Sequence, residues 1–315
     1  MESKINILFL GGSKRVSVAE IFINAGKALN KKVNIFSYEL SPYEPIAEIG
    51  TIIKGLKWAD PDILNNLKRA IRGYDINIVV PFVDIATILC AKLQEQLPQI
   101  YWCVSNENIC NILFDKSKSQ DWFKSNNFLI PATEIKLPLI AKLKTGSGAK
   151  GIKFLLSESN MDLFFREGNS DNYFLQEMIA GEEFSVDCFV GKMGDIVSVV
   201  PRKRLEVMNG EATRSITVKD EQVVKESINI LKAGGFKGPV TIQFICQVNT
   251  GVLYLIEINP RFGSGILTSI RAGANICQFI LNDYLGLENL EVLDWKENLL
   301  MVRAFKEYYF YATDN

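Results

Sequence analysis

The chain of 315 residues is 48 % apolar and 23 % charged, with 35 basic and 36 acidic side chains, a balance typical of globular proteins that favours neither nucleic acid nor a membrane as partner. Its length exceeds the usual size of one hydrophobic core, so we expect two or three lobes with a cleft between them. It contains no histidine, which excludes Ser-His and Cys-His nucleophile pairs and histidine-ligated metals.

The first 105 residues or so alternate apolar runs with segments of helical spacing. Apolar runs predict strands at 5–10, 33–36, 76–80 and 101–104, and the spacing of apolar residues predicts helices at 16–29, 60–71 and 84–96. This alternation predicts a parallel sheet in a first lobe that covers residues 1–111. A further helix is expected at 117–126, with Asp115 placed to cap it.

The pattern changes after Pro138. Strands are expected at 139–144, 152–156 and 173–178 and a helix at 160–166, which predicts a small α+β lobe within residues 112–181. Longer strands at 184–190, 196–200, 240–246 and 252–258, with helices at 221–233 and 269–285, predict an antiparallel sheet backed by helices in residues 182–315.

The small lobe contains the glycine loop Gly146-Ser147-Gly148-Ala149-Lys150-Gly151. A dinucleotide-binding loop would open a helix, but a strand is expected next, and a Walker loop would need Lys-Ser or Lys-Thr where Ile152-Lys153 stands. A glycine loop between two strands can instead close over ATP phosphates as a flap, using its backbone N–H groups. The alternative is a plain hairpin turn.

Two lysines are candidate contacts for the phosphates that this loop would cover. Lys142 precedes the flap, where its side chain can reach phosphate oxygens, and Lys116 begins a helix, where backbone N–H groups favour anions. The alternative is that both are surface lysines.

Further groups suited to a nucleotide follow. The strand end Gln176-Glu177-Met178-Ile179 can offer backbone groups to an adenine edge, and Glu182 or Glu183 can accept both ribose hydroxyls or simply lie in an exposed turn. Arg202-Lys203-Arg204, Arg214 and Arg261 supply cations for a triphosphate and an anionic substrate, with a solvated basic loop as the alternative.

A predicted hairpin turns at Asn249-Thr250-Gly251, where the glycine suits the left-handed position of a three-residue loop. If Val248 pairs with Val252, counting along the strands places Gln243 opposite Glu257. Period-two alternation then separates a polar face from a buried one. We expect Gln243, Glu257 and Asn259 on the first face and Ile242, Ile256 and Ile258 on the second.

One carboxylate and two amide oxygens form a hard-oxygen set that suits Mg²⁺, with Mn²⁺ as the alternative metal. The structural alternative is a solvated polar face on an amphipathic hairpin. The segment that follows, Pro260-Arg261-Phe262-Gly263-Ser264-Gly265, favours the metal, because arginine and flexible glycines suit a phosphate or carboxylate pocket. We therefore predict Gln243, Glu257 and Asn259 as metal ligands.

In their order along the chain, these motifs resemble the ATP-grasp superfamily and, within it, the carbamoyl phosphate synthase large-subunit-like proteins. The most specific part is Gln243 followed by Glu257-Ile258-Asn259-Pro260-Arg261, which resembles the magnesium motif of the family. The resemblance implies an ATP-grasp fold with a Rossmann-like first lobe, a central lid lobe and a C-terminal lobe that carries the metal site. It implies that Glu257 bridges two Mg²⁺ ions.

The resemblance also assigns the nucleotide contacts. Lys116 and Lys142 match the two nucleotide lysines, residues 176–179 match the adenine hinge, and Glu183 matches the ribose carboxylate better than Glu182 does. The flap glycines and serine, Gly146, Ser147, Gly148 and Gly151, complete the ATP contacts.

The activity that the resemblance implies is a carboxylate–amine ligase, in which ATP activates a carboxylate as an acyl phosphate and an amine or ammonia displaces phosphate. Arg261, Lys142 and Arg202 are the expected catalytic residues. One ATP site is present where carbamoyl phosphate synthase needs two, so we do not expect carbamoyl phosphate as product. The alternatives are a non-catalytic ATP-binding or scaffold protein and, less favoured, a nicotinamide-dependent oxidoreductase, because Gly11-Gly12-Ser13 lacks the spaced glycines.

Six cysteines lie mostly in apolar stretches without Cys-x-x-Cys spacing, which predicts reduced core residues in a cytoplasmic protein. The first apolar run is too short for a signal peptide core or a membrane span. Partners are expected to be small carboxylates and amines, and a homodimer is one assembly consistent with the sequence.

Overall fold

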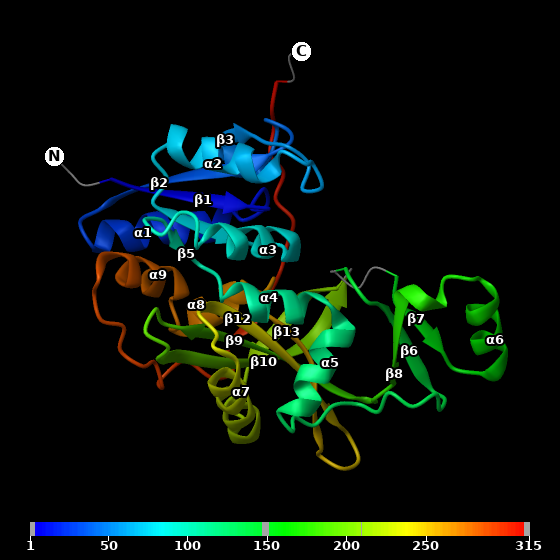
Figure 1. Cartoon of the computed structure of the whole chain (residues 1–315). Helices are drawn as coiled ribbons and strands as arrows, with labels where there is room; N and C mark the ends of the chain where they lie inside the picture. The colour runs from blue at the N-terminus through cyan, green and yellow to red at the C-terminus, as the bar shows by residue number, and fades with distance from the viewer. Residues whose placement is uncertain (1–3, 147–150, 209, 312–315) are drawn as a thin grey trace.

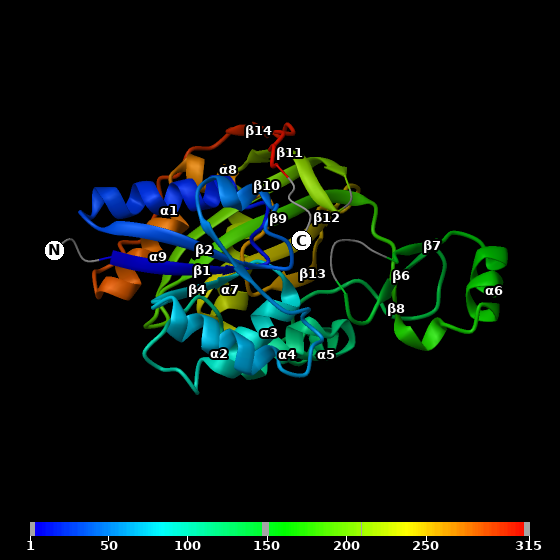
Figure 2. The same cartoon turned by 90° about the horizontal axis from the view of Figure 1, so that it is seen from above.

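The structure is a computed structural model that describes residues 4–146, 151–208 and 210–311. Three sheets organise this part of the chain (Figure 1). Two larger sheets stack through helices, and the small third sheet projects to one side, as Figure 2 shows from above. The architecture predicted from the sequence, with a parallel first sheet, a small central sheet and an antiparallel last sheet, is confirmed.

The first sheet is parallel and has the strand order β3-β2-β1-β4-β5. Its strands are β1 (Lys4–Leu10), β2 (Lys32–Glu39), β3 (Thr51–Lys54), β4 (Ile78–Pro81) and β5 (Tyr101–Trp102), connected through α1 (Val16–Ala28), the 3-10 turn η1 (Pro45–Glu48), α2 (Ile63–Gly73) and α3 (Asp84–Leu93). Helix α1 packs on one face, and α2 and α3 pack on the other. The chain leaves β1 toward β2 on one side and reaches β4 on the other, so the switch point of the sheet lies between β1 and β4.

Two helices, α4 (Glu107–Phe114) and α5 (Lys116–Ser125), lead to the small sheet. The predicted cap is confirmed, because the Asp115 carboxylate accepts hydrogen bonds from the backbone N–H groups of Ser117 and Lys118. The small antiparallel sheet has the order β7-β6-β8. Its elements are β6 (Leu139–Leu143), β7 (Lys153–Leu155), α6 (Glu158–Arg166), the 3-10 turn η2 (Ser170–Asn172) and β8 (Tyr173–Glu177).

The last sheet is antiparallel, in the order β13-β12-β9-β10-β11-β14. Its strands are β9 (Gly181–Val190), β10 (Ile196–Met208), β11 (Glu211–Thr217), β12 (Gly238–Gln247), β13 (Leu253–Asn259) and β14 (Leu300–Val302). Helix α7 (Glu221–Gly234) packs against one face. Helices α8 (Ile266–Ala272) and α9 (Ile276–Leu285) lie toward the first lobe and share a hydrophobic core with β1 and α1.

Several predicted elements need correction. The helix expected at 269–285 is two helices, because Gly273 takes a φ of 130° and Asn275 caps α9 by accepting a hydrogen bond from the N–H of Gln278. Strand β10 continues through Arg202-Lys203-Arg204, where a loop was expected. The short strands β3, β11 and β14 and helix α4 were not predicted.

The hairpin register shows two deviations that compensate each other. Near the turn, Cys246 pairs with Leu253, one residue out of the predicted register, because Gln247 rather than Val248 bonds to Val252. A β-bulge in β13 then inserts one extra residue, and Gln243 pairs with Glu257 as predicted. Thr241 then pairs with Asn259.

The bulge also decides which isoleucines are buried. Ile242 and Ile258 are buried as predicted, but Ile256 is only half-buried because it is the extra residue. The inserted residue keeps Leu255 and Ile258 in the same core, although three positions separate them.

Within the three described stretches, no helix is long and apolar enough to cross a membrane. The predicted lobe boundaries fall within α4 at 111/112 and at the start of β9 at 181/182. The C-terminal segment after β14 runs along the first lobe, where the ring of Phe310 lies 6.0 Å from that of Tyr43 (Figure 1).

Candidate active site

A pocket lies where the three lobes meet. Its wall includes Asp84 at the start of α3, Lys116 at the start of α5, Gly146 from the loop after β6, and Glu257 and Asn259 from β13. Four of these five residues, all except Asp84, were proposed from the sequence as nucleotide or metal contacts. They come from three separate segments of the chain, the first and last of which are more than 100 residues apart, and the packing of the lobes brings them together.

The three predicted metal ligands lie on neighbouring strands. Gln243 is directly opposite Glu257 in the β12–β13 pair, and Asn259 follows two residues later. Within the described part of the chain, the Glu257 carboxylate accepts no hydrogen bond and forms no ion pair, so its oxygens are available to a ligand. A carboxylate with two amide oxygens fits the donor preference of Mg²⁺.

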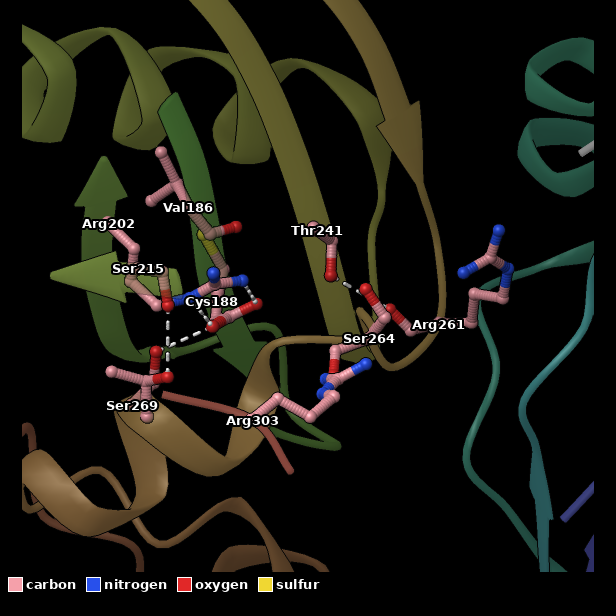
Figure 3. A network of polar contacts seen from close by, with 11 residues as sticks. Val186, Cys188, Arg202, Ser215, Thr241, Arg261, Ser264, Ser269 and Arg303 are labelled. Carbon is pink, nitrogen blue, oxygen red and sulfur yellow. Dashed lines mark hydrogen bonds and ion pairs between the residues drawn. The ribbon is translucent and has the colours of Figure 1, made fainter. Parts of the chain in front are cut away.

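Arg261 connects this hairpin to the first lobe. Its Nε donates to the Asp84 carboxylate, and its Nη2 donates to the Asn259 side-chain oxygen at 3.0 Å. Nη1 donates to the backbone carbonyl of Phe262 at 3.2 Å. The guanidinium is therefore held by three partners beside the proposed metal ligands. In Figure 3, Arg261 extends away from the sheet that carries Thr241.

Of the two predicted lysines, Lys116 lines the pocket and Lys142 lies on β6. Lys116 Nζ donates to the Gly146 carbonyl at 2.9 Å, which ties α5 to the start of the glycine loop. Lys142 Nζ donates to the Gln176 side-chain oxygen at 3.0 Å. Burial lowers the pKa of Lys142, Lys116 adds to this effect, and Glu257 and Glu183 oppose it. These electrostatic effects indicate that Lys142 lies close to Lys116, Glu183 and Glu257.

The strand end proposed for adenine lies on β8 and just beyond it. Gln176 is buried, and its amide reaches Gln120 of α5 at 3.5 Å. The backbone N–H of Glu177 donates to Ala132, and that of Met178 donates to Pro138. The adenine edge would therefore have to use other backbone groups of this segment, which ends at the buried Ile179.

Both candidate ribose carboxylates form ion pairs with β10. Glu183 pairs with Arg204 at 2.8 Å, and Glu182 pairs with Lys203 at 2.8 Å. Their side chains are about half exposed, 46 % for Glu183 and 57 % for Glu182. Only Glu183 contributes to the electrostatic surroundings of Lys142, which places it closer to the other candidate nucleotide residues.

Arg202 is deeply buried, with a side chain only 2 % exposed. Its Nε donates to Asp187 at 2.6 Å, and Ser269 donates to the same carboxylate at 2.5 Å (Figure 3). A side chain added at Gly265 would collide with this guanidinium. Arg202 thus lies beneath the loop of residues 263–265 rather than on the surface of the pocket.

The glycine loop is described only at its ends. Gly146 has a φ of 136° and Gly151 a φ of 71°, which side-chain-bearing residues rarely adopt. A Cβ at Gly151 would also lie 2.8 Å from the Leu143 side chain. Ser147 and Gly148, two of the predicted ATP contacts, lie outside the described residues.

Three residues that take part in this region were given no individual role from the sequence. Asp84 anchors Arg261, and Glu211 and Arg303 form an ion pair near the arginine. Asp84 could have been found, because it follows β4 at the carboxyl edge of a parallel sheet, where ligand sites gather. Glu211 and Arg303 carry no local signal of this kind.

Solved structures share this arrangement of lobes. The biotin carboxylase domain of Hydrogenobacter thermophilus 2-oxoglutarate carboxylase, solved with MgADP, ADP and bicarbonate, aligns with a TM-score of 0.76 and 16 % identity over 94 % of this chain and 73 % of that chain. The L-amino acid ligase from Bacillus licheniformis aligns with a TM-score of 0.69 and 18 % identity over 90 % and 75 %. The fold is therefore the ATP-grasp fold.

Sequence comparison agrees with this fold. The D-alanine–D-alanine ligase of Rickettsia felis is 22 % identical over 318 aligned residues, which cover 87 % of this chain and 91 % of the relative. The family described as ATP-grasp in the biosynthetic pathway with Ter operon matches residues 169–307. The chain thus has the ATP-grasp fold, and its C-terminal part is similar in sequence to an ATP-grasp family.

Proposed function

We propose that this protein is an ATP- and Mg²⁺-dependent ligase that joins a carboxylate to an amine or ammonia. The γ-phosphoryl group of ATP passes to a carboxylate oxygen and ADP leaves. The amine nitrogen then attacks the acyl carbon, phosphate leaves and the amine loses a proton. Phosphoryl transfer depends mainly on positioning and charge neutralisation, which suits a chain without histidine.

The observation that carries the proposal is the convergence of Lys116, Gly146, Glu257 and Asn259 on one pocket. These residues were selected from local sequence patterns and from the resemblance of those patterns to a known family, and they meet in space. A solvated hairpin face or an isolated surface lysine would not require this convergence.

Each residue has a proposed role. Glu257, Asn259 and Gln243 would hold Mg²⁺, which offsets the charge of the β- and γ-phosphates when bound. Lys116 and Lys142 would contact phosphate oxygens, and the loop that ends at Gly151 would cover them. Residues 176–179 would hold the adenine and Glu183 the ribose.

The two arginines have different proposed roles. Arg261, fixed by Asp84, would stabilise charge on the phosphoryl group or acyl phosphate during transfer. Because Arg202 is buried under residues 263–265, its contribution to catalysis would be to hold that loop in place.

The amine partner is proposed by analogy. Distant similarity to D-alanine–D-alanine ligase and to an L-amino acid ligase supports ligation of amino-acid-like substrates. The finer likeness to carbamoyl phosphate synthase-like proteins rests on the magnesium motif and stays a prediction.

The test is phosphate release from ATP-Mg²⁺ across a panel of amino acids and small carboxylates. The wild type and the exposed control Glu95→Ala should release phosphate with at least one pair of substrates, and Glu257→Ala should not, although its circular dichroism spectrum is unchanged. Unchanged turnover in Glu257→Ala would refute the metal assignment. ATP binding without ADP release across the whole panel would support the non-catalytic alternative.

A further inference from the structure

Three arginines from distant parts of the chain gather beside the candidate active site. Arg15 lies at the start of α1, Arg261 follows β13, and Arg303 follows β14. Burial lowers the pKa of Arg15; Glu211 opposes this effect, and Arg303 and Arg261 add to it. The guanidinium groups of Arg303 and Arg261 therefore both lie within electrostatic range of that of Arg15.

A single glutamate connects two of these arginines. Arg303 Nη1 pairs with the Glu211 carboxylate, whose other oxygen lies 3.8 Å from Arg15 Nη2. Arg303 is also anchored by Nη2, which donates to the Ser264 carbonyl at 2.6 Å, and Figure 3 shows these two residues side by side. Arg15 lies over the ring of Phe82 at 5.8 Å. Both cations are thus held in place by contacts other than Glu211.

The charges of the cluster do not cancel. Arg15, Arg261 and Arg303 contribute three positive charges, and Glu211 and Asp84 contribute two negative charges. The cluster is also accessible to solvent, since the side chains of Arg15, Arg303 and Glu211 are 24 %, 28 % and 47 % exposed. An excess of accessible positive charge in forked guanidinium groups suits a carboxylate or phosphate.

The position in the fold favours a ligand. Arg15 follows β1, and Asp84 follows β4, so both lie at the carboxyl edge of the sheet at its switch point, where open α/β sheets bind ligands. Helix α1 begins at Arg15 with no side-chain cap and no acidic residue in its first turn, so its dipole adds to the positive potential.

Two buried polar atoms nearby lack a partner among the described residues. One is the hydroxyl of Thr213, a residue two positions after Glu211 on β11 whose carbonyl accepts the N–H of Arg303. The other is Nη1 of Arg202, under Gly265. Buried polar atoms without a partner call for an explanation, and a bound polar group beside the cluster would supply one for Thr213.

We propose that Arg15 and Arg303 form a subsite for a second, non-reacting anionic group of the substrate, either carboxylate or phosphate. Glu211 holds the two guanidinium groups together without ligand and swings away, being nearly half exposed, when the anion binds between them. This inference rests on the proposed function, in which Arg261 faces the reacting carboxylate. The substrate would therefore be a dianion with its reacting end at Arg261.

The experiment compares dianions with matched monoanions by titration calorimetry, with a non-hydrolysable ATP analogue and Mg²⁺ present to saturate the nucleotide site. The probes are succinate against its monomethyl ester for a carboxylate, and 3-phosphonopropionate against propionate for a phosphate-like group. We expect the wild type to prefer the dianion of at least one pair by roughly tenfold. The pair that shows the preference identifies the chemistry of the second group.

The variants separate a binding role from a structural one. Arg15→Gln and Arg303→Gln should each abolish the dianion preference, whereas Glu211→Gln should tighten dianion binding, because it removes the internal competitor. The control Arg271→Gln, on the exposed face of α8, should match the wild type. If the cluster only fastens the C-terminal segment to the rest of the protein, dianion binding should weaken in all three cluster variants or in none of them.

Equal affinity for dianion and monoanion in the wild type with both pairs would overturn the proposal, as would an unchanged preference in Arg15→Gln and Arg303→Gln. Absence of nucleotide binding in the wild type would overturn the proposed function instead. The dianion preference is then measured without nucleotide, so the two failures are distinguishable.

Discussion

Arg261 and Asp84 form an ion pair across 177 residues of sequence, and this pair joins the end of the β12–β13 hairpin to the first lobe. The same guanidinium bonds to the Asn259 side chain. The first lobe therefore takes part in orienting the proposed phosphoryl-transfer site rather than only carrying substrate contacts.

Asp84→Asn should slow turnover without weakening ATP binding. The variant removes a charge-assisted hydrogen bond worth about 1.5–3 kcal/mol, so Arg261 loses its fixed orientation and kcat should fall roughly tenfold or more. ADP production at saturating ATP, combined with nucleotide titration, measures the two effects separately. Asp62→Asn, which removes an exposed ion pair with Arg69, is the matched control and should change neither kcat nor the affinity for ATP. A weaker affinity for ATP at unchanged kcat would contradict this role.

Lys142 should make stability depend on pH. Burial lowers its pKa below the usual value of about 10.4, so the unfolded chain binds more protons than the folded chain between the two pKa values. The free energy of unfolding should therefore rise with pH across that window, and below the folded pKa the cost of the buried charge is fully present.

Urea unfolding of the wild type and Lys142→Met at pH values from roughly 7 to 10 measures this contribution. The difference between the two proteins should shift in favour of the wild type as pH rises. The exposed control Lys118→Met should run parallel to the wild type. A difference that stays flat across the window would show that Lys142 titrates as a solvated lysine.

Breaking the buried pair of Arg202 and Asp187 should lower the free energy of unfolding strongly, whereas replacing both residues with apolar ones should lower it little. Asp187→Leu leaves an uncompensated guanidinium in the core, so we expect a loss of about 3–5 kcal/mol in the free energy of unfolding. The double variant Asp187→Leu with Arg202→Met should recover most of that loss. Denaturant unfolding of Asp187→Leu, Arg202→Met and the double variant forms a double-mutant cycle. If the two single losses simply add up in the double variant, the two groups are not coupled.

Gly251→Ala should destabilise the hairpin without disturbing the site. Gly251 has a φ of 68°, and nothing lies within 4 Å of an added Cβ, so the cost comes from the backbone alone and should be about 1 kcal/mol. The β-bulge maintains the pairing of Gln243 with Glu257 independently of the turn, so ATP turnover should persist. At Gly73, at the end of α2, nothing lies within 4 Å of an added Cβ either, and Gly73→Ala should instead raise the free energy of unfolding. Loss of turnover in Gly251→Ala would show that the turn controls the register.

The hairpin illustrates how far local rules reach. Alternation and the glycine turn were sufficient to predict that Gln243 faces Glu257, although the loop is longer than expected and a bulge restores the register. The bulge itself was not predictable, because it depends on which of Leu255, Ile256 and Ile258 the core accommodates.

Long-range polar pairs were the least predictable features. The sequence placed Arg202 among the catalytic groups by its charge, but the register of β9 and β10 brings it to Asp187 in the core. Similarly, no local pattern connects Arg15, Glu211 and Arg303, which meet only when α1, β11 and β14 assemble.

By itself the sequence determined the alternating and antiparallel segments, the glycine loop, the lysines and the oxygen-bearing face of the hairpin, because these follow from backbone periodicity and residue chemistry over a few neighbours. Tertiary structure alone decided which charges are buried, which are paired and which remain in excess beside the pocket. Those properties depend on desolvation and on Coulomb interactions between residues that are distant in sequence.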